Sequence, residues 1–282
     1  MMLHEIYPHK FDITYTQRKA SDNDFIVICK GNGILVKEED DGIILPRVKN
    51  IYDSADTDGI NELRFLFTLD GDIGVYKAEV DSLDGFAPVS PRELRTKKPM
   101  WISYAAVVAF RLNVWYKDTK FCGRCGSPMT HSDSERAMIC SNAECKNTVY
   151  PSICPSVIVL IKDGDRALLT RYAVNHSNYR RYALVAGYVE TGETPEDTVA
   201  REVYEEVGLN VKNITYYKSQ PWPISGALLL GYICDLDGSD KVRLDENELE
   251  TAVWVNRADI PDRSADVSLT SELMEMFRTG KI

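Results

Sequence analysis

The sequence of 282 residues lacks the features that mark secreted and membrane-spanning proteins. Its first residues, MMLHEIYPHKFDITYTQ, contain no basic segment followed by an apolar core, so we expect no signal peptide. The longest apolar run, at residues 100–110, is about half as long as a membrane-spanning helix requires. We therefore expect a cytoplasmic protein that has no membrane partner.

Positive charge is also scarce, because 33 Lys and Arg residues stand against 43 Asp and Glu residues. The net charge of −10 is opposite in sign to that of a protein with a broad phosphate-binding surface. This balance argues against a dedicated nucleic-acid-binding protein but is compatible with a local basic groove. Hydrophobic residues make up 44% of the chain, which is ordinary for a globular protein.

The seven cysteines are odd in number, and four of them cluster, which argues against a disulfide framework and favours a reducing compartment. The cluster reads Cys122-x2-Cys125 followed by Cys140-x4-Cys145. Two such turns place four thiolates around a tetrahedral Zn²⁺. Because four sulfurs leave no open coordination position, the predicted zinc is structural and supplies folding energy to a segment with little core. His131 is an alternative to one of these ligands.

The patterning predicts an α+β chain in four parts, which are a β-rich N-terminal domain at 1–95, a linking helix within 96–120, a zinc ribbon at 121–149 and a further domain at 150–282. Hairpin signals occur around Gly31-Asn32-Gly33 and Asp70-Gly71. No chemical motif occurs in the first part, so we expect it to be a scaffold or a dimerisation surface. The linking helix is expected at 100–118.

The last part is predicted to mix strands and helices. We expect helices at residues 195–207 and about 268–279. Strands are expected near residues 156–162, 166–172, 182–189, 213–220, 226–235 and 250–255.

The segment GETPEDTVAREVYEEVG, residues 192–208, places many acidic residues on one predicted helix. Thr194 and Asp197 fit a capping box around Pro195, and Gly208 fits the C-terminal stop. Valines at every fourth position form the stripe expected to be buried.

Three glutamates of this helix, Glu202, Glu205 and Glu206, lie close enough to repel one another. A bound divalent cation reverses the sign of that interaction, because Mg²⁺ and Mn²⁺ take carboxylate oxygens as ligands. The segment therefore predicts a divalent metal site. The alternative is a solvated acidic face.

The residues from Gly187 to Leu209 fit the pattern G-x5-E-x7-R-E-U-x-E-E-x-G-U, in which U is apolar, at every defined position. The chain resembles the Nudix hydrolase superfamily, whose members use Mg²⁺ or Mn²⁺ to cleave a nucleoside diphosphate linked to another moiety. The resemblance implies the Nudix α/β/α sandwich fold. It also implies that Arg201 and Glu193 orient the metal ligands. The implied ligands are Glu202, Glu205, Glu206 and a loop carbonyl at Ala186 or Gly187.

The stretch SQPWP, residues 219–223, follows the box. A four-cysteine module, a Nudix box and this stretch in that order resemble the NADH pyrophosphatase family, and the likeness spans most of the chain. The family signature continues as F-P-x-S, from which this chain departs at Ile224, Ser225 and Ala227, so the nucleotide preference is in question. The resemblance implies substrate contacts from Ser219, Gln220 and Trp222.

Three more positions match the family. Tyr188 stands where the family stacks an aromatic ring on a substrate base, and Tyr150 stands where a second ring comes from the partner subunit. The resemblance thus implies a homodimer, whereas a packed core or interface role is the alternative for each ring. Glu248 matches a late acidic residue that completes the metal or base site.

The sequence thus predicts hydrolysis of the pyrophosphate bond of NAD(H) to nicotinamide mononucleotide and AMP, with Glu205 or Glu248 as the general base. The resemblance extends this chemistry to NAD caps at RNA 5′ ends. The closest alternative is a Nudix hydrolase for ADP-ribose or another nucleoside diphosphate derivative. A non-catalytic ligand sensor is disfavoured by the three glutamates, and a zinc-ribbon nucleic-acid module by the acidic charge.

Overall fold

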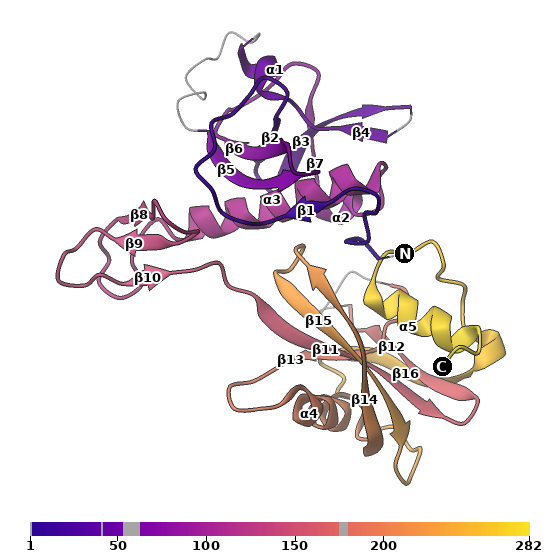
Figure 1. Ribbon diagram of the computed structural model, residues 1–282. Helices are drawn as coiled ribbons and strands as arrows, with labels where there is room; N and C mark the ends of the chain where they lie inside the picture. The colour runs from indigo at the N-terminus through magenta and orange to yellow at the C-terminus, as the bar shows by residue number, and fades with distance from the viewer. Residues whose placement is uncertain (1, 41, 53–62, 175–179) are drawn as a thin grey trace. The chain divides into compact units, whose positions relative to one another are not determined.

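The chain divides into two compact units, seen in a computed structural model that describes residues 2–40, 42–52, 63–174 and 180–282 (Figure 1). The N-terminal unit contains residues 3–152 and the turn 223–225, and the C-terminal unit contains residues 153–222 and 226–282 with Met2. No helix in the described part of the chain is long and apolar enough to cross a membrane.

The N-terminal unit is built on a sheet with the strand order β1-β5-β6-β2-β3-β4, in which β7 pairs with β3. The two predicted hairpins are confirmed, since β2 pairs with β3 and β5 pairs with β6, both antiparallel. The strands are β1 (Phe11–Asp12), β2 (Phe25–Lys30), β3 (Gly33–Glu39), β4 (Gly42–Ile44), β5 (Arg64–Leu69), β6 (Ile73–Ala78) and β7 (Ala87–Val89).

Three helices accompany this sheet, namely α1 (Val48–Tyr52), α2 (Pro91–Leu94) and α3 (Met100–Asp118). Helix α3 has the predicted bounds and packs against β2, β4 and β6. Most of its side chains are buried, including Tyr104 and Trp115. The long apolar run of the sequence is therefore a core helix of the N-terminal unit.

The cysteine module follows α3 as a small sheet of β8 (Met129–His131), β9 (Met138–Cys140) and β10 (Thr148–Val149). Side-chain hydrogen bonds join it to the N-terminal sheet. The Arg136 guanidinium donates to the Ile13 carbonyl at 3.0 Å and to the Leu66 carbonyl at 2.5 Å. The Tyr15 hydroxyl donates to the Ser132 carbonyl at 3.2 Å.

The C-terminal unit has the sandwich fold predicted from the sequence. Its sheet has the order β14-β15-β11-β12-β16, with β13 on β11, and β15 runs parallel to β11. Helix α4 covers a core on one face and α5 covers a separate core on the other (Figure 1). The elements are β11 (Cys154–Asp163), β12 (Arg166–Tyr172), β13 (Val185–Tyr188), α4 (Pro195–Val207), β14 (Val211–Trp222), β15 (Ala227–Leu236), β16 (Leu249–Asn256) and α5 (Leu269–Arg278).

Helix α4 begins and ends where its sequence predicts. Thr194 and Asp197 form the capping box, and Gly208 ends the helix in the left-handed conformation with φ of 68°. Val199, Val203 and Val207 are fully buried against β11 and β13. Strand β13 is shorter than the predicted 182–189, because Ala183 makes only an isolated bridge to Thr170 of β12.

A buried glutamine fixes the start of α5. Gln220 of β14 is fully buried, and its amide nitrogen donates to the Val267 carbonyl at 2.9 Å. Its amide oxygen accepts from the backbone N–H of Leu269, the first residue of α5, at 2.6 Å. The bond from Leu269 satisfies one of the N–H groups that a helix N-terminus otherwise leaves unpaired, and the bond to Val267 holds the segment that leads into the helix.

We expect Gln220→Ala to lower the free energy of unfolding by about 2–4 kcal/mol, because it leaves two buried backbone groups without partners. Urea denaturation measures the change. The neighbouring half-buried Ser219 provides the control, since Ser219→Ala should cost less than about 0.5 kcal/mol. Equal losses in the two variants would show that the hydrogen bonds to α5 contribute little.

Candidate functional site

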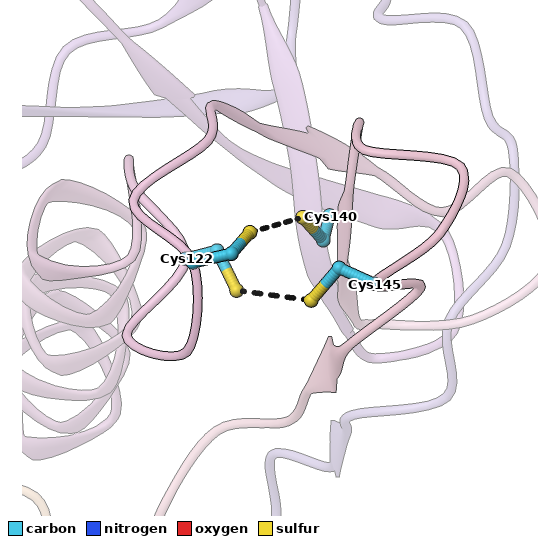
Figure 2. Close-up of side chains that lie close together, drawn as sticks. Cys122, Cys140 and Cys145 are labelled. Atoms are coloured by element: carbon cyan, nitrogen blue, oxygen red, sulfur yellow. Dashed lines mark hydrogen bonds between the residues drawn. The ribbon is translucent and has the colours of Figure 1, made fainter.

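The four clustered cysteines bring their sulfur atoms together, and Figure 2 labels Cys122, Cys140 and Cys145 among them. Their sulfur atoms all lie within 4.8 Å of one another. The Cys122 and Cys145 sulfurs are 3.9 Å apart, and the Cys125 and Cys140 sulfurs are 3.4 Å apart. A tetrahedral zinc with bonds of about 2.3 Å has S···S edges of about 3.8 Å, whereas a disulfide bond is about 2.05 Å long. The spacing therefore fits zinc and excludes disulfides.

The environment of these thiols also suits a bound cation. Hydrogen bonds from Ser127 lower the pKa of Cys125 to about 6, whereas burial raises the pKa of Cys140 to about 12. A thiolate at Cys140 therefore needs a positive partner, which zinc supplies. His131 lies with its ring 5.2 Å from that of Tyr116, outside the group of four sulfurs. The ligand set is thus four cysteines.

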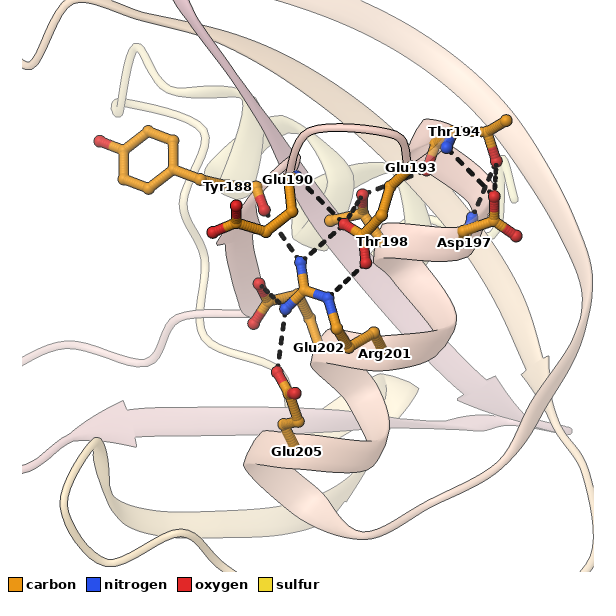
Figure 3. A network of polar contacts seen from close by, with 9 residues as sticks. All are labelled: Tyr188, Glu190, Glu193, Thr194, Asp197, Thr198, Arg201, Glu202 and Glu205. Atoms are coloured by element: carbon orange, nitrogen blue, oxygen red, sulfur yellow. Dashed lines mark hydrogen bonds and ion pairs between the residues drawn. The ribbon is translucent and has the colours of Figure 1, made fainter.

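Arg201 of α4 is the centre of the polar network in the C-terminal unit (Figure 3). Its Nε and Nη2 donate to the two carboxylate oxygens of Glu193 at 2.6 and 2.9 Å. Its Nη1 donates to Glu202 at 2.7 Å and to Glu205 at 2.9 Å, and Nη2 also donates to the Tyr188 carbonyl at 3.0 Å. This guanidinium links the loop after β13 to two of the three box glutamates of α4.

Glu193 anchors the guanidinium in turn. Its carboxylate accepts from Arg201, from the Glu190 N–H at 3.1 Å and from the Thr198 hydroxyl at 2.9 Å. These bonds lower its pKa to about 2, with Arg201 as the largest cause. The supporting role that the resemblance implied for Glu193 and Arg201 therefore has a geometric basis in ion pairing.

Gly187 leaves the space that the Glu202 carboxylate fills. A Cβ atom placed on Gly187 would lie 1.9 Å from Cδ of Glu202, far inside van der Waals contact. The Glu202 side chain is mostly buried, and burial raises its pKa while Arg201 opposes the rise. The glycine of the Nudix pattern is thus required so that this carboxylate can lie against β13.

Glu206 is the most buried acid of the site. It is 2% exposed, and one carboxylate oxygen accepts from the Ala186 N–H at 3.4 Å. The other oxygen, Oε2, is buried without a hydrogen-bond partner in the described part of the chain. The pKa of Glu206 is raised to about 8, mainly by burial, and the charges of Glu248 and Glu202 contribute to the rise.

Glu248 approaches the same place from the segment before β16. Its carbonyl accepts from the Ala173 N–H at 2.8 Å, and its charge also raises the pKa of Glu202. The neighbouring Asp245 N–H donates to the Glu206 carbonyl at 2.9 Å, which ties this segment to the end of α4. The sequence-predicted acids therefore come together from α4 and from the segment before β16.

These acids fit a hard divalent cation. Carboxylate oxygens are the ligands that Mg²⁺ and Mn²⁺ prefer, and a buried unpartnered oxygen such as Glu206 Oε2 is costly unless a cation compensates it. The four predicted carboxylates are less tightly gathered than the cysteines, which alone bring ligand atoms within 4.8 Å of one another among the described residues. Arg201 holds the Glu202 and Glu205 carboxylates to itself.

Ser156 lies beside the site, and no sequence motif indicates that it has a role there. Ser156 of β11 is buried, and its hydroxyl donates to the Gly187 carbonyl at 2.9 Å. This bond engages one of the two carbonyls predicted as a metal ligand and leaves that of Ala186 as the other candidate. The pairing of Ser156 with Tyr188 across β11 and β13 depends on strand register, which no local motif reveals.

The predicted substrate-contacting residues fall into two groups. Tyr188 is 52% exposed beside the Arg201 network, and Tyr150 is 53% exposed in the N-terminal unit, where its hydroxyl donates to Glu135 at 3.1 Å. Ser219 and Trp222 of β14 are half-buried, and Trp222 packs against the core under α5. Both ends of the Gln220 amide bond to the backbone at the start of α5, at Val267 and Leu269.

Comparison with known families identifies two domains of the chain. Residues 153–274 match the NUDIX domain, and residues 117–150 match the NADH pyrophosphatase zinc ribbon domain. The chain therefore contains a NUDIX domain that follows a zinc ribbon domain of the NADH pyrophosphatase type. Both resemblances predicted from the sequence, and the predicted fold class, are confirmed.

Individual relatives are similar over about half of the chain. A protein of Mannheimia succiniciproducens named NAD-capped RNA hydrolase NudC is 42% identical over 146 residues, which cover 51% of this chain and 54% of that protein. The protein of the same name from Salmonella typhi is 44% identical over 151 residues, or 54% of this chain and 57% of that protein. A solved NUDIX hydrolase from Nitrosomonas europaea is 21% identical, covers 57% of this chain and 92% of that one, and has a TM-score of 0.49. The chain spans about half the length of the curated relatives it matches.

We expect elemental analysis to find one zinc per chain, and Cys140→Ser to remove it, because three thiolates and a hydroxyl hold zinc more weakly. The exposed Cys154, outside the cluster, gives a matched control: Cys154→Ser should keep its zinc. Full zinc content in the Cys140 variant would contradict the four-cysteine assignment.

We expect the zinc-loaded protein, without added Mg²⁺ or Mn²⁺, to lose stability as pH rises from about 5 to 8. The reason is that unfolded Glu206 ionises near pH 4.3, whereas in the folded state its pKa is raised to about 8, so the folded state holds the extra proton in this window. The contribution is present below the unfolded pKa and is lost through the folded pKa, at up to about 1.4 kcal/mol per pH unit.

Urea denaturation of wild type and Glu206→Gln across this pH range isolates the effect, since the difference between the two profiles removes other titrating groups. Mn²⁺ should stabilise wild type more at pH 7.5 than at pH 5.5, because the cation binds the deprotonated carboxylate. Parallel profiles for the two proteins would contradict the assignment of the raised pKa to Glu206.

Proposed function

We propose that this protein hydrolyses the pyrophosphate bond of NAD(H) to nicotinamide mononucleotide and AMP, and that it removes NAD caps from RNA 5′ ends. The observation that carries the proposal is the Arg201 network with the buried Glu206 beside it, in a Nudix domain that follows an NADH pyrophosphatase zinc ribbon. The names of the relatives, NAD-capped RNA hydrolase, support the same substrate class.

The residues of the site have different roles in holding a divalent cation and a pyrophosphate. Glu202, Glu205, Glu206 and Glu248, with the Ala186 carbonyl, would hold Mg²⁺ or Mn²⁺. When bound, the cation neutralises pyrophosphate oxygens that repel a nucleophile and makes a water molecule more acidic. Arg201 aims Glu202 and Glu205, and Glu193 keeps the guanidinium fixed.

A carboxylate must also accept the proton of the attacking water. Glu205 is the box glutamate that solvent reaches most easily, with 56% of its side chain exposed, and Glu248 lies on the segment that faces Glu206. Either can act as the general base within hydrogen-bond reach of a bound water. Tyr188 offers an exposed ring for stacking on the substrate base.

The proposal includes a homodimer in the cytoplasm. A second copy of the chain would supply Tyr150, whose ring is exposed, so that two tyrosines clamp one flat base. A reducing compartment keeps the zinc thiolates from oxidation.

We expect the protein to release AMP and reduced nicotinamide mononucleotide from NADH in the presence of Mn²⁺. Glu206→Gln should lower kcat roughly a hundred-fold or more, since the neutral amide is a poor ligand for a hard cation. Product chromatography measures both rates.

Glu196 on the same helix is the matched control, because its carboxylate accepts from the Tyr232 hydroxyl at 2.9 Å and lies outside the proposed site. Glu196→Gln should turn over NADH at close to the wild-type rate. ADP-ribose hydrolysed far faster than NADH would favour the alternative enzyme, in keeping with the departure at Ile224–Ala227. Wild-type turnover by Glu206→Gln would rule out the metal assignment.

A further inference from the structure

Ser156 is a buried polar residue on an apolar face of β11. Its side chain is 7% exposed, and Ile158 and Leu160, which share its face of the strand, belong to the core under α5. A hydroxyl in such a place is unfavourable unless it is hydrogen-bonded. The Ser156 hydroxyl donates to the Gly187 carbonyl at 2.9 Å, so its bond to β13 is what makes a serine acceptable there.

The bonded carbonyl belongs to the peptide that leads into Tyr188, the residue predicted to stack on a substrate base. Ser156 stands directly opposite Tyr188 in the antiparallel pairing of β11 with β13, and β13 ends at Tyr188. The N–H of the next residue, Val189, donates to the Pro155 carbonyl at 3.1 Å. The Ser156 hydroxyl therefore holds the backbone at the end of a strand, where pairing is otherwise lost most easily.

The Tyr188 ring depends on this backbone for its direction. The residue is 52% exposed, and Figure 3 shows the ring directed away from the Arg201 network. Neither the ring nor its hydroxyl has a ring contact or a hydrogen bond within the part of the chain that the structure describes. A side chain without packing of its own is directed only by its backbone and by its rotamer.

Two other contacts hold the same stretch of β13, and both involve the acidic network. Nη2 of Arg201 donates to the Tyr188 carbonyl at 3.0 Å, and the Glu202 carboxylate fills the space beside Gly187. A cation that binds Glu202 competes with the ion pair between Glu202 and Arg201, so it disturbs both contacts. The Ser156 bond joins two neutral groups and does not depend on that competition.

We propose that Ser156 is a positioning residue, which holds the Gly187 carbonyl and thereby fixes the direction of the Tyr188 ring toward the substrate base. This inference rests on the proposed function, and it adds a residue that acts through Tyr188 rather than on the substrate. Ser156 keeps the ring in place while the neighbouring acids exchange Arg201 for a cation.

The division of the effect between KM and kcat tests this role. We expect Ser156→Ala to raise KM for NADH about five-fold, which is the size expected for one neutral hydrogen bond, while kcat changes less than about two-fold. The Mn²⁺ concentration that gives the half-maximal rate should also stay within about two-fold, because the metal ligands are unchanged. A wild-type KM, or a loss confined to kcat or to the Mn²⁺ dependence, would overturn the proposal.

A double-mutant cycle shows whether Ser156 acts through the ring. Tyr188→Ala should raise KM for NADH about ten-fold or more, since stacking on an aromatic ring is lost. In that background Ser156→Ala should change KM less than about two-fold, because no ring remains to be positioned. If the two substitutions instead multiply in their effects on KM, Ser156 acts independently of Tyr188 and the proposal fails.

Ser103 of α3 is the matched control. It is fully buried in the N-terminal unit, and its hydroxyl donates to the Lys97 carbonyl at 2.9 Å. Ser103→Ala removes the same kind of bond and should keep the wild-type KM, whereas an equal rise of KM would assign the effect to lost stability. If Ser156→Ala fails to fold, Ser156→Cys takes its place in every comparison, because cysteine has a similar shape and a weaker donor.

Amide exchange tests the anchor without catalysis. We expect the Val189 N–H to exchange with deuterium about five-fold or more faster in Ser156→Ala than in wild type, followed by NMR on the full zinc-loaded chain. Ser103→Ala should retain the wild-type rate at Val189. Equal exchange in wild type and Ser156→Ala would overturn the proposal. If wild type fails to hydrolyse NADH at all, the proposed function fails, while the exchange rate still decides whether Ser156 holds the end of β13.

Discussion

The candidate site of the C-terminal unit depends on one arginine. This residue holds together acidic side chains that would otherwise repel one another. Arg201 binds Glu193 through two hydrogen bonds and reaches Glu202, Glu205 and the Tyr188 carbonyl with its remaining donors. Arginine suits this role because its planar guanidinium presents five donors in fixed directions. The loop after β13 and the acidic face of α4 are therefore kept in one arrangement before any cation or substrate binds.

The energetically least favourable side chain of the site is Glu206. A buried carboxylate oxygen without a partner is unfavourable, and here the fold contributes only a long hydrogen bond from Ala186 to the other oxygen. The buried valines of α4 hold Glu206 in this position, so the helix cannot relieve the strain by turning. The protein thus uses the stability of its core to keep an acid where a cation gains most from it. The zinc ribbon is arranged in a similar way, because its fold brings together four cysteine sulfurs whose charges a bound zinc would compensate.

Much of the fold and of the candidate site could be predicted from the sequence, because the informative patterns are local. The cap residues and valine stripe of α4 lie within one helix, and the four cysteines lie within two short turns, so spacing alone indicates both. The Gln220 bonds to α5 cross 47 and 49 residues of sequence, and the Ser156 bond to Gly187 crosses 31. These contacts depend on strand register and on how the chain returns to the sheet, which no short pattern encodes. The pairing of Arg201 with Glu205 follows from their i,i+4 spacing, whereas its pairing with the adjacent Glu202 depends on side-chain direction, which spacing does not reveal.

The most direct measurement of the central claim is a crystal structure of the protein soaked in Mn²⁺, with anomalous scattering recorded at the manganese edge. The account predicts an anomalous peak within bonding distance of Glu206 Oε2, with the Glu202 or Glu205 carboxylate withdrawn from Arg201 to share it. An empty site beside Glu206, at a Mn²⁺ concentration that supports hydrolysis of NADH in solution, would contradict it.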